Sequence, residues 1–134
     1  NNQWYKTNMV YSLMMADSWL SKYTCIISYS DIYYNSKAIK LLKNAKNNFV
    51  ILNNKNWLSN WKSRYKNPLM DAESFKVDKK KNLIEIGRRE KKIKNIKGQY
   101  MGLIKITPKI WKLIKQKFPM IKKKKQNFYY SAIR

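Results

Sequence analysis

The acidic side chains that could bind a metal ion are few in this sequence, and one stands at a suggestive place. Only 7 of the 134 residues are Asp or Glu, against 30 Lys and Arg. Asp31 closely follows the largely apolar residues 25–29, which predict a short buried strand. A carboxylate beyond the carboxyl end of such a strand can hold Mg²⁺ against nucleotide phosphates. Asp31 is therefore the candidate metal ligand, and a loop acid that caps the next turn is the alternative.

A second group of polar residues could face a small-molecule substrate. Asp71 and Glu73 lie close together before a predicted strand and could bind sugar hydroxyls or a cationic group; turn or helix-start acids are the alternative. Residues 98–103 contain two of the chain's 3 glycines. Glycine in a strand often marks the close approach of a ligand, and Gln99 and Tyr100 add hydrogen-bonding groups. A bulge without a ligand is the alternative for this segment.

Several kinds of chemistry are excluded or lack a signal. The chain has no histidine, which excludes His-based acid–base chemistry within it, and Cys25 is its single cysteine, which excludes an internal disulfide framework. The sequence contains no glycine-rich phosphate loop of the common types. No signal peptide is recognisable, and no uncharged apolar stretch approaches the ~18 residues of a membrane span. We expect a cytoplasmic protein without a membrane span.

The net charge of +23 leaves two interpretations open. A strongly basic chain is typical of nucleic-acid-binding modules, and the lysine runs at 79–81 and 122–125 favour that class. However, lysine greatly outnumbers arginine, whereas bidentate recognition of bases and phosphates favours arginine. Lys, Asn, Ile and Tyr make up almost half of the chain, which indicates an A/T-rich genome. We expect no specific nucleic-acid partner and keep a Lys-rich nucleic-acid-binding module, of ribosomal or organellar type, as the alternative.

The first half of the chain alternates helix-like and strand-like patterns. Apolar spacing predicts a helix over residues 8–22, capped by Thr7 or Asn8, and a second helix that begins at the cap Ser36. Buried strands are predicted at residues 25–29 and 49–52. Helices that alternate with strands through short connections are the signature of parallel βαβ units.

The second half contains a predicted hairpin, a strand and a long helix. Residues 74–77 and 83–86 flank a basic loop, residues 88–97 read as a charged surface loop, and residues 100–106 alternate as a strand. Thr107 and Pro108 begin a helix that Pro119 is expected to close. Six of the chain's aromatic residues could stack on bases, although helical spacing favours a core role. They are Trp57, Trp61, Tyr65, Trp111, Tyr129 and Tyr130.

Six segments taken together, in this order and spacing, resemble sugar-phosphate nucleotidyltransferases, especially the branch similar to bacterial phosphocholine cytidylyltransferases. They are residues 7–13 (TNMVYSL), 26–32 (IISYSDI), Trp57, 67–75 (NPLMDAESF), 84–87 (IEIG) and 98–103 (GQYMGL). The resemblance covers about residues 4–118. It implies a Rossmann-like, three-layer α/β/α fold with a mainly parallel sheet plus a small hairpin. Residues 1–134 would form the middle and C-terminal part of one such domain.

The resemblance also implies an activity and assigns residues to it. Family members bind a nucleoside triphosphate and Mg²⁺ and join a nucleoside monophosphate to a sugar 1-phosphate or phosphocholine, releasing pyrophosphate. Asp31 matches the metal-binding aspartate, and Asn8 and Ser12 match the helix start near the nucleotide. The region that faces the second substrate is matched by Asp71, Glu73, Gly98, Gln99, Tyr100 and Gly102. The resemblance identifies no catalytic acid or base.

Two elements of the family pattern are not found in this chain. The family opens with a glycine-rich loop that wraps the triphosphate, which would precede Asn1. A second metal-binding aspartate usually follows the point where this chain stops. We therefore expect that the sequence is a fragment of an enzyme and that it has no activity alone.

Overall fold

The computed structural model describes the backbone of residues 1–123 and the side chains of residues 1–117. The end of the lysine run at residues 122–125 and the aromatic residues Tyr129 and Tyr130 lie outside the described residues. The chain divides into two compact units, one formed by residues 1–50 and 103–134 and the other by residues 51–102. None of the helices described is long and apolar enough to cross a membrane.

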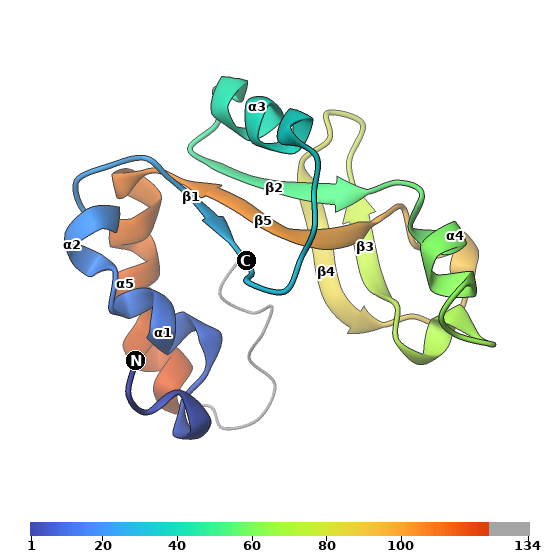
Figure 1. Cartoon of the computed structure of the whole chain (residues 1–134), viewed down its shortest axis with the longest axis horizontal. Coiled ribbons are helices and arrows are strands. Elements are labelled where there is room, and N and C mark those ends of the chain that lie inside the picture. Colours follow the sequence, from blue (N-terminus) through green and yellow to red (C-terminus); the bar gives the residue numbers. More distant parts are fainter. Residues whose placement is uncertain (124–134) are drawn as a thin grey trace. The chain divides into compact units, whose positions relative to one another are not determined.

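The first unit contains the chain's early helices and its last helix (Figure 1). Its elements, with β2 and β5 continuing into the second unit, are η1 (Trp4–Lys6), α1 (Met9–Met14), α2 (Asp17–Leu20), β1 (Cys25–Ser28), α3 (Ser36–Asn44), β2 (Phe49–Asn54), β5 (Gln99–Ile106) and α5 (Pro108–Lys123). The single helix predicted over residues 8–22 is thus two short helices, separated at Met15 and Ala16. α5 continues to Lys123, so the prediction that Pro119 closes it is wrong.

The caps of α1 and α3 show how short polar side chains start these helices. Asn8 caps α1 by accepting the Tyr11 N–H at 3.0 Å, as predicted. For α3 the prediction was one residue late, because Asn35 rather than Ser36 is the cap and accepts the Lys37 N–H at 2.9 Å. Asn accepts this bond as readily as Ser does, so the composition of the segment did not distinguish the two residues.

The strand order in the first sheet is β1–β5–β2. β1 pairs antiparallel with β5, Cys25 lying opposite Ile106. Thr107, directly after β5, donates its N–H at 3.0 Å to the carbonyl of Asn48, directly before β2. The end of β5 therefore lies beside the start of β2, and this pair is antiparallel too. The mixture of helices and strands agrees with the α/β prediction, but the described sheets are antiparallel, so the predicted mainly parallel sheet is not observed. β5 also separates β1 from β2, which the βαβ prediction had as neighbours.

The core of the first unit packs α2 and α5 against the sheet. One cluster of this core contains the buried residues Leu20, Ile106 and Trp111, with Trp111 fully inaccessible to solvent. A buried tryptophan removes a large apolar area from water, and its indole N–H needs a hydrogen-bond partner. That partner is Asp17, whose carboxylate accepts from Trp111 Nε1 at 2.6 Å and from Lys115 Nζ at 2.7 Å. These bonds connect α2 with α5, and the Asp17–Trp111 bond joins residues 94 positions apart in the sequence.

The second unit is built around the predicted hairpin. Its elements are the rest of β2, α4 (Trp57–Lys62), η2 (Pro68–Met70), β3 (Glu73–Val77), β4 (Leu83–Arg89), η3 (Ile93–Asn95) and the start of β5. β3 and β4 are antiparallel, with Phe75 opposite Ile86. These two residues are buried, as are Trp57, Ala72 and Ile96. The charged surface loop predicted at residues 88–97 is wrong in part, because it begins within β4 and contains buried Ile96.

Candidate functional site

The predicted metal ligand Asp31 lies in the turn after β1, in the first unit. Its side chain is exposed, and within residues 1–117 the structure shows no hydrogen bond or ion pair to it. The described residues contain no group of three or more His, Cys, Asp or Glu side chains that could hold a metal ion. An exposed single carboxylate suits Mg²⁺ only when substrate phosphates and water supply the other oxygens. The donor chemistry of Asp31 fits that arrangement.

The predicted nucleotide-binding residues Asn8 and Ser12 already have local partners. Asn8 caps α1, and Ser12 Oγ accepts a hydrogen bond from Asn1 Nδ2 at 2.8 Å. The same amide donates to Thr7 Oγ1 at 2.8 Å. The start of α1 is thus organised by side chains of the chain itself. A nucleotide that uses Ser12 would have to exchange its contact with Asn1, and the nucleotide-binding role of both residues stays a prediction.

Two predicted substrate residues, Glu73 and Gln99, are joined by an exchange of hydrogen bonds. Gln99 Nε2 donates to the Glu73 carbonyl at 2.6 Å, and the Glu73 N–H donates to Gln99 Oε1 at 3.2 Å. Gln99 Nε2 also donates to the Gly98 carbonyl at 2.9 Å. Gln99 is only 6% exposed. Its amide therefore connects the start of β5 to the start of β3 and fixes the backbone that carries the Glu73 carboxylate.

Gly98 and Gly102 are favoured at their positions for different structural reasons. A Cβ on Gly98 would lie 3.1 Å from Asn53 Cγ, so the close approach that glycine permits here is to a side chain of β2. Gly102 has φ 74°, a left-handed conformation that disfavours other residues within a strand. Tyr100 is half-buried on β5, and its hydroxyl oxygen is inaccessible to solvent. The alternative interpretation, an irregular strand without a ligand, accounts for both glycines.

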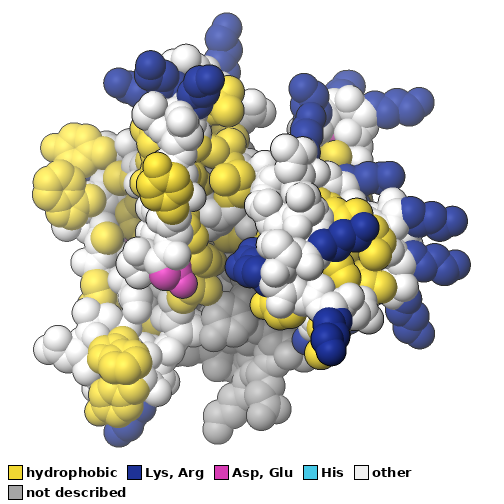
Figure 2. All heavy atoms as spheres, turned by 45° about the vertical axis from the view of Figure 1, so that its right-hand side comes forward, with side chains coloured by type: hydrophobic (Ala, Val, Ile, Leu, Met, Phe, Trp, Pro, Cys, Tyr) yellow, Lys and Arg dark blue, Asp and Glu magenta, His cyan; other side chains and the backbone are white. Residues whose placement is uncertain are grey.

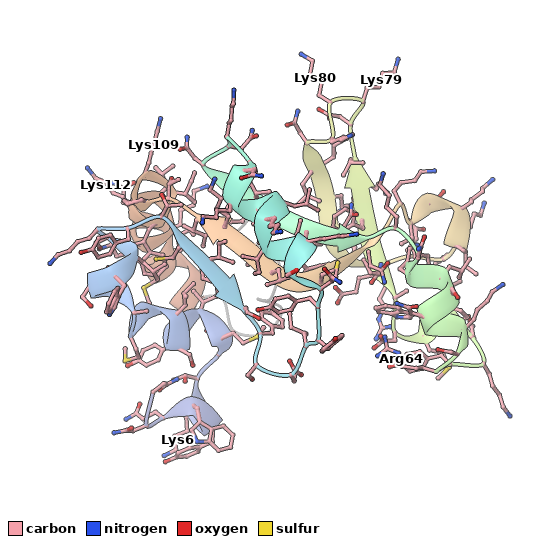
Figure 3. The ribbon with its side chains drawn as sticks, turned by 45° about the horizontal axis from the view of Figure 1, so that its top comes forward. Lys6, Arg64, Lys79, Lys80, Lys109 and Lys112 are labelled. Atoms are coloured by element: carbon pink, nitrogen blue, oxygen red, sulfur yellow. The ribbon has the colours of Figure 1, made fainter. Side chains whose placement is uncertain are left out.

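Asp71 lies beside an aromatic pair from α4. Trp61 Nε1 donates to Asp71 Oδ2 at 2.9 Å, and the rings of Trp57 and Trp61 meet edge to face with centroids 6.1 Å apart. The guanidinium of Arg64 lies 4.7 Å from the centroid of a Trp61 ring, a cation–π distance. Figure 3 shows Arg64 just beyond the end of α4. The core role that helical spacing favours holds for Trp57, which is 3% exposed, whereas Trp61 is half-buried.

The remaining acids of the second unit mostly neutralise basic neighbours. Glu85 lies 3.0 Å from Lys76 and 3.5 Å from Arg88, and Glu90 lies 3.8 Å from Lys76. The pKa of Glu85 is lowered, mainly by its hydrogen bond to Lys76, and the pKa of Glu90 is lowered, mainly by its hydrogen bond to Asn95. Both carboxylates are therefore held in the charged form by structural contacts. Lys and Arg side chains project from much of the face in Figure 2.

The predicted substrate residues Asp71, Glu73, Gly98 and Gln99 thus lie in the second unit, where hydrogen bonds connect the last three. The predicted metal and nucleotide residues lie in the first unit. Arg64 was not among the predicted site residues, although two signals pointed to it: arginine is scarce in this chain, and Arg64 follows Trp61 by three residues in a helical pattern. Asp17 was not predicted either, because its partners Trp111 and Lys115 are distant in sequence and gave no local signal.

Comparison with known proteins relates this chain to a nucleotidyltransferase. The chain is 36% identical over 112 residues to the CTP:phosphoglutamine cytidylyltransferase of Campylobacter jejuni subsp. jejuni serotype O:2. The match covers 80% of this chain and 44% of that protein, so the chain spans less than half the length of the relative. No family model and no solved structure matches the chain. The predicted relationship to nucleotidyltransferases is confirmed at this general level.

Proposed function

We propose that this chain is part of a nucleotidyltransferase that transfers a cytidylyl group from CTP to a phosphorylated small molecule and releases pyrophosphate. The observation that carries the proposal is the 36% identity, over 80% of the chain, to a CTP:phosphoglutamine cytidylyltransferase. The same similarity favours a transferase over the Lys-rich nucleic-acid-binding module. Because its substrates would be intracellular metabolites, we place the protein in the cytoplasm.

The proposed chemistry needs few specialised side chains. A phosphate oxygen of the acceptor would attack the α-phosphorus of CTP in line, forming one P–O bond as the bond to pyrophosphate breaks. Catalysis of phosphoryl transfer consists mainly of positioning and charge stabilisation, so the lack of histidine does not count against it. Asp31 would hold a magnesium ion, which supplies charge neutralisation of the phosphates. Asn8 and Ser12 would lie near the nucleotide, as the resemblance implies.

Polypeptide beyond this chain would complete the domain. The relative has more than half of its length outside the match, and β1 and β2 are the edge strands of the described sheet. Strands added at these edges would give the mainly parallel, Rossmann-like sheet of three-layer folds. We therefore propose that residues 1–134 belong to one domain and that the chain alone has no nucleotidyl transfer activity.

Three acceptor classes follow from the resemblance and from the relative: a sugar 1-phosphate, phosphocholine, and a phosphorylated amino acid. A choline site built from Asp71, Glu73 and the nearby aromatic rings is disfavoured by the geometry. Trp57 is buried, and Arg64 already covers a face of Trp61. A quaternary ammonium would have to displace a guanidinium from that face.

The experiment measures pyrophosphate release from CTP with Mg²⁺ and each of the three acceptor classes. It compares the 134-residue chain with a supplemented protein, in which the same chain is fused to the part of the Campylobacter protein that lies outside the match. We expect turnover only in the supplemented protein and only with Mg²⁺. Failure of a folded, supplemented protein to release pyrophosphate with every acceptor, from CTP or any other nucleoside triphosphate, contradicts the proposed function.

A further inference from the structure

In the second unit, one positively charged and one negatively charged side chain contact the indole ring of Trp61. Arg64 lies over the Trp61 ring at 4.7 Å, and Asp71 accepts the Trp61 N–H at 2.9 Å. Both charged side chains are exposed, so both are accessible to a solute. Trp61 belongs to α4, Arg64 lies just after α4, and Asp71 follows η2, so the arrangement lies wholly within the second unit.

Neighbouring contacts hold this arrangement in place. Trp57, almost fully buried, packs edge to face against Trp61 and fixes the orientation of its ring. On the other side, Asn67 caps η2 by accepting the Leu69 N–H at 3.1 Å, and Pro68 is buried. These contacts fix the backbone that leads into Asp71. A preorganised pair of charges binds a ligand without the entropy cost of ordering long side chains.

The charges of Arg64 and Asp71 are not neutralised by the described part of the protein. Neither makes an ion pair there, with the other or with any third residue, whereas Lys76, Arg88 and Lys115 all do. Arg64 Nε has only a long contact, 3.5 Å, to the Asn60 carbonyl. The forked guanidinium therefore keeps donors for a carboxylate, and Asp71 keeps lone pairs for a cationic donor.

We infer that Arg64, Trp61 and Asp71 bind the zwitterionic head of an α-amino acid. Its carboxylate would accept hydrogen bonds from Arg64, and its ammonium group would donate to Asp71. The inference rests on the proposed function and narrows it, because the acceptor phosphate is then carried by an amino acid. Choline has no carboxylate and a sugar phosphate has no ammonium group, so each can satisfy only one of the two charges.

The test follows the Trp61 indole N–H by NMR in the 134-residue chain, with the signal assigned by Trp61→Phe. L-Glutamine is the probe; its N-acetyl derivative lacks the ammonium charge, its α-amide lacks the carboxylate, and choline lacks the carboxylate as well. We expect a saturable shift with L-glutamine and binding about tenfold or more weaker with each analogue, since a hydrogen bond between charged groups typically contributes at least this factor.

Matched variants separate the site from general charge effects. Arg64→Gln and Asp71→Asn should each weaken L-glutamine binding about tenfold or more; asparagine keeps an acceptor for the Trp61 N–H but loses the charge. Lys66→Gln removes the same charge as Arg64→Gln from a nearby exposed position and should leave binding unchanged. No saturable shift with L-glutamine, or equal binding of any analogue, overturns the inference.

Failure of this site and failure of the proposed function are distinguishable. If the supplemented protein releases pyrophosphate only with a sugar 1-phosphate or phosphocholine, the amino-acid site is wrong and nucleotidyl transfer stands. If L-glutamine binds at Trp61 but no acceptor supports pyrophosphate release, the binding site stands and the enzymatic proposal is wrong.

Discussion

The side-chain amide of Gln99 and the backbone of Glu73 hydrogen-bond to each other in both directions, across 26 residues of sequence. The pair joins the start of β5 to the start of β3, two strands that belong to different sheets. It also positions the backbone next to Asp71, because only Ala72 separates the two acids. The stability of the second unit and the geometry of its predicted substrate residues thus depend on one buried side chain.

Gln99→Ala should lower the free energy of unfolding by about 2–4 kcal/mol, because it removes both hydrogen bonds between this buried amide and the Glu73 backbone. Urea unfolding followed by tryptophan fluorescence measures the change. Gln116→Ala, which truncates an exposed glutamine on α5, is the control and should change the stability by less than ~0.5 kcal/mol. Equal effects of the two variants contradict the structural role of Gln99.

Gly98→Ala should be destabilising because its new methyl group would lie 3.1 Å from Asn53 Cγ. Truncating the neighbour in the double variant Gly98→Ala/Asn53→Ala should restore much of the loss. Gly102→Ala should cost about 1–2 kcal/mol through its positive φ, and the Asn53→Ala change should not relieve that cost. A double-mutant cycle in urea measures both couplings. Equal coupling of Asn53 to the two glycines would show that this account is incorrect.

The Asp17 contacts should make stability depend on acid pH. Its pKa is lowered from 3.8 to about 2, chiefly by the hydrogen bond from Lys115 and then by that from Trp111. A carboxyl group whose pKa is lower in the folded state contributes stability above its unfolded pKa, and this contribution disappears as the pH falls through the folded pKa. Asp17→Asn should therefore be less stable than the wild type at pH 5–7, with the difference shrinking between about pH 4 and pH 2.

Urea midpoints measured from pH 7 to about pH 2 for the wild type and Asp17→Asn test this dependence. The comparison between the two proteins is needed because the pKa values of Asp78, Glu85 and Glu90 are also lowered. Asp31→Asn removes an exposed carboxylate that has no described contact and serves as the control. A difference between wild type and Asp17→Asn that stays constant over the whole pH range contradicts the prediction.

Nucleic-acid binding should be weak, nonspecific and steeply dependent on salt. The net charge of +23 attracts any polyanion, but phosphate contacts from exposed lysines carry no sequence information. Electrophoretic shift assays with several DNA and RNA sequences, at low and at physiological salt, measure this. A complex that prefers one sequence and has sub-micromolar affinity at physiological salt would favour the nucleic-acid-binding alternative.

Asp31→Asn in the supplemented, active protein should lower turnover roughly 10²–10³-fold, as expected when a charge that stabilises the transition state is lost. The substitution nearly preserves shape, and because Asp31 is exposed we expect the variant to fold normally. Asp78→Asn, at a hairpin turn of the second unit, is the control for removal of a carboxylate charge and should retain turnover. Near-normal turnover of Asp31→Asn at limiting Mg²⁺ would remove its assignment as metal ligand.

The sequence by itself determined the local structure and the class of relative. Short apolar runs, one alternating segment and a basic loop located the five strands of the described residues, and helical apolar spacing located the major helices, because these patterns reflect which parts of an element are buried. The Asn8 cap and the Thr107–Pro108 helix start were also readable, since they depend on bonds within a few residues. The ordered set of motifs indicated nucleotidyltransferases, and the similarity to a cytidylyltransferase agrees.

Tertiary structure alone decided the contacts between distant segments. The insertion of β5 between β1 and β2, the Asp17–Trp111 bond and the Gln99–Glu73 exchange all join residues far apart in sequence. No periodic pattern encodes such partners, because burial of one face is compatible with many neighbours. The same holds for Arg64, whose place over Trp61 depends on how the exposed end of α4 turns. Hydrogen-bond satisfaction and side-chain packing select one arrangement only once the elements are assembled.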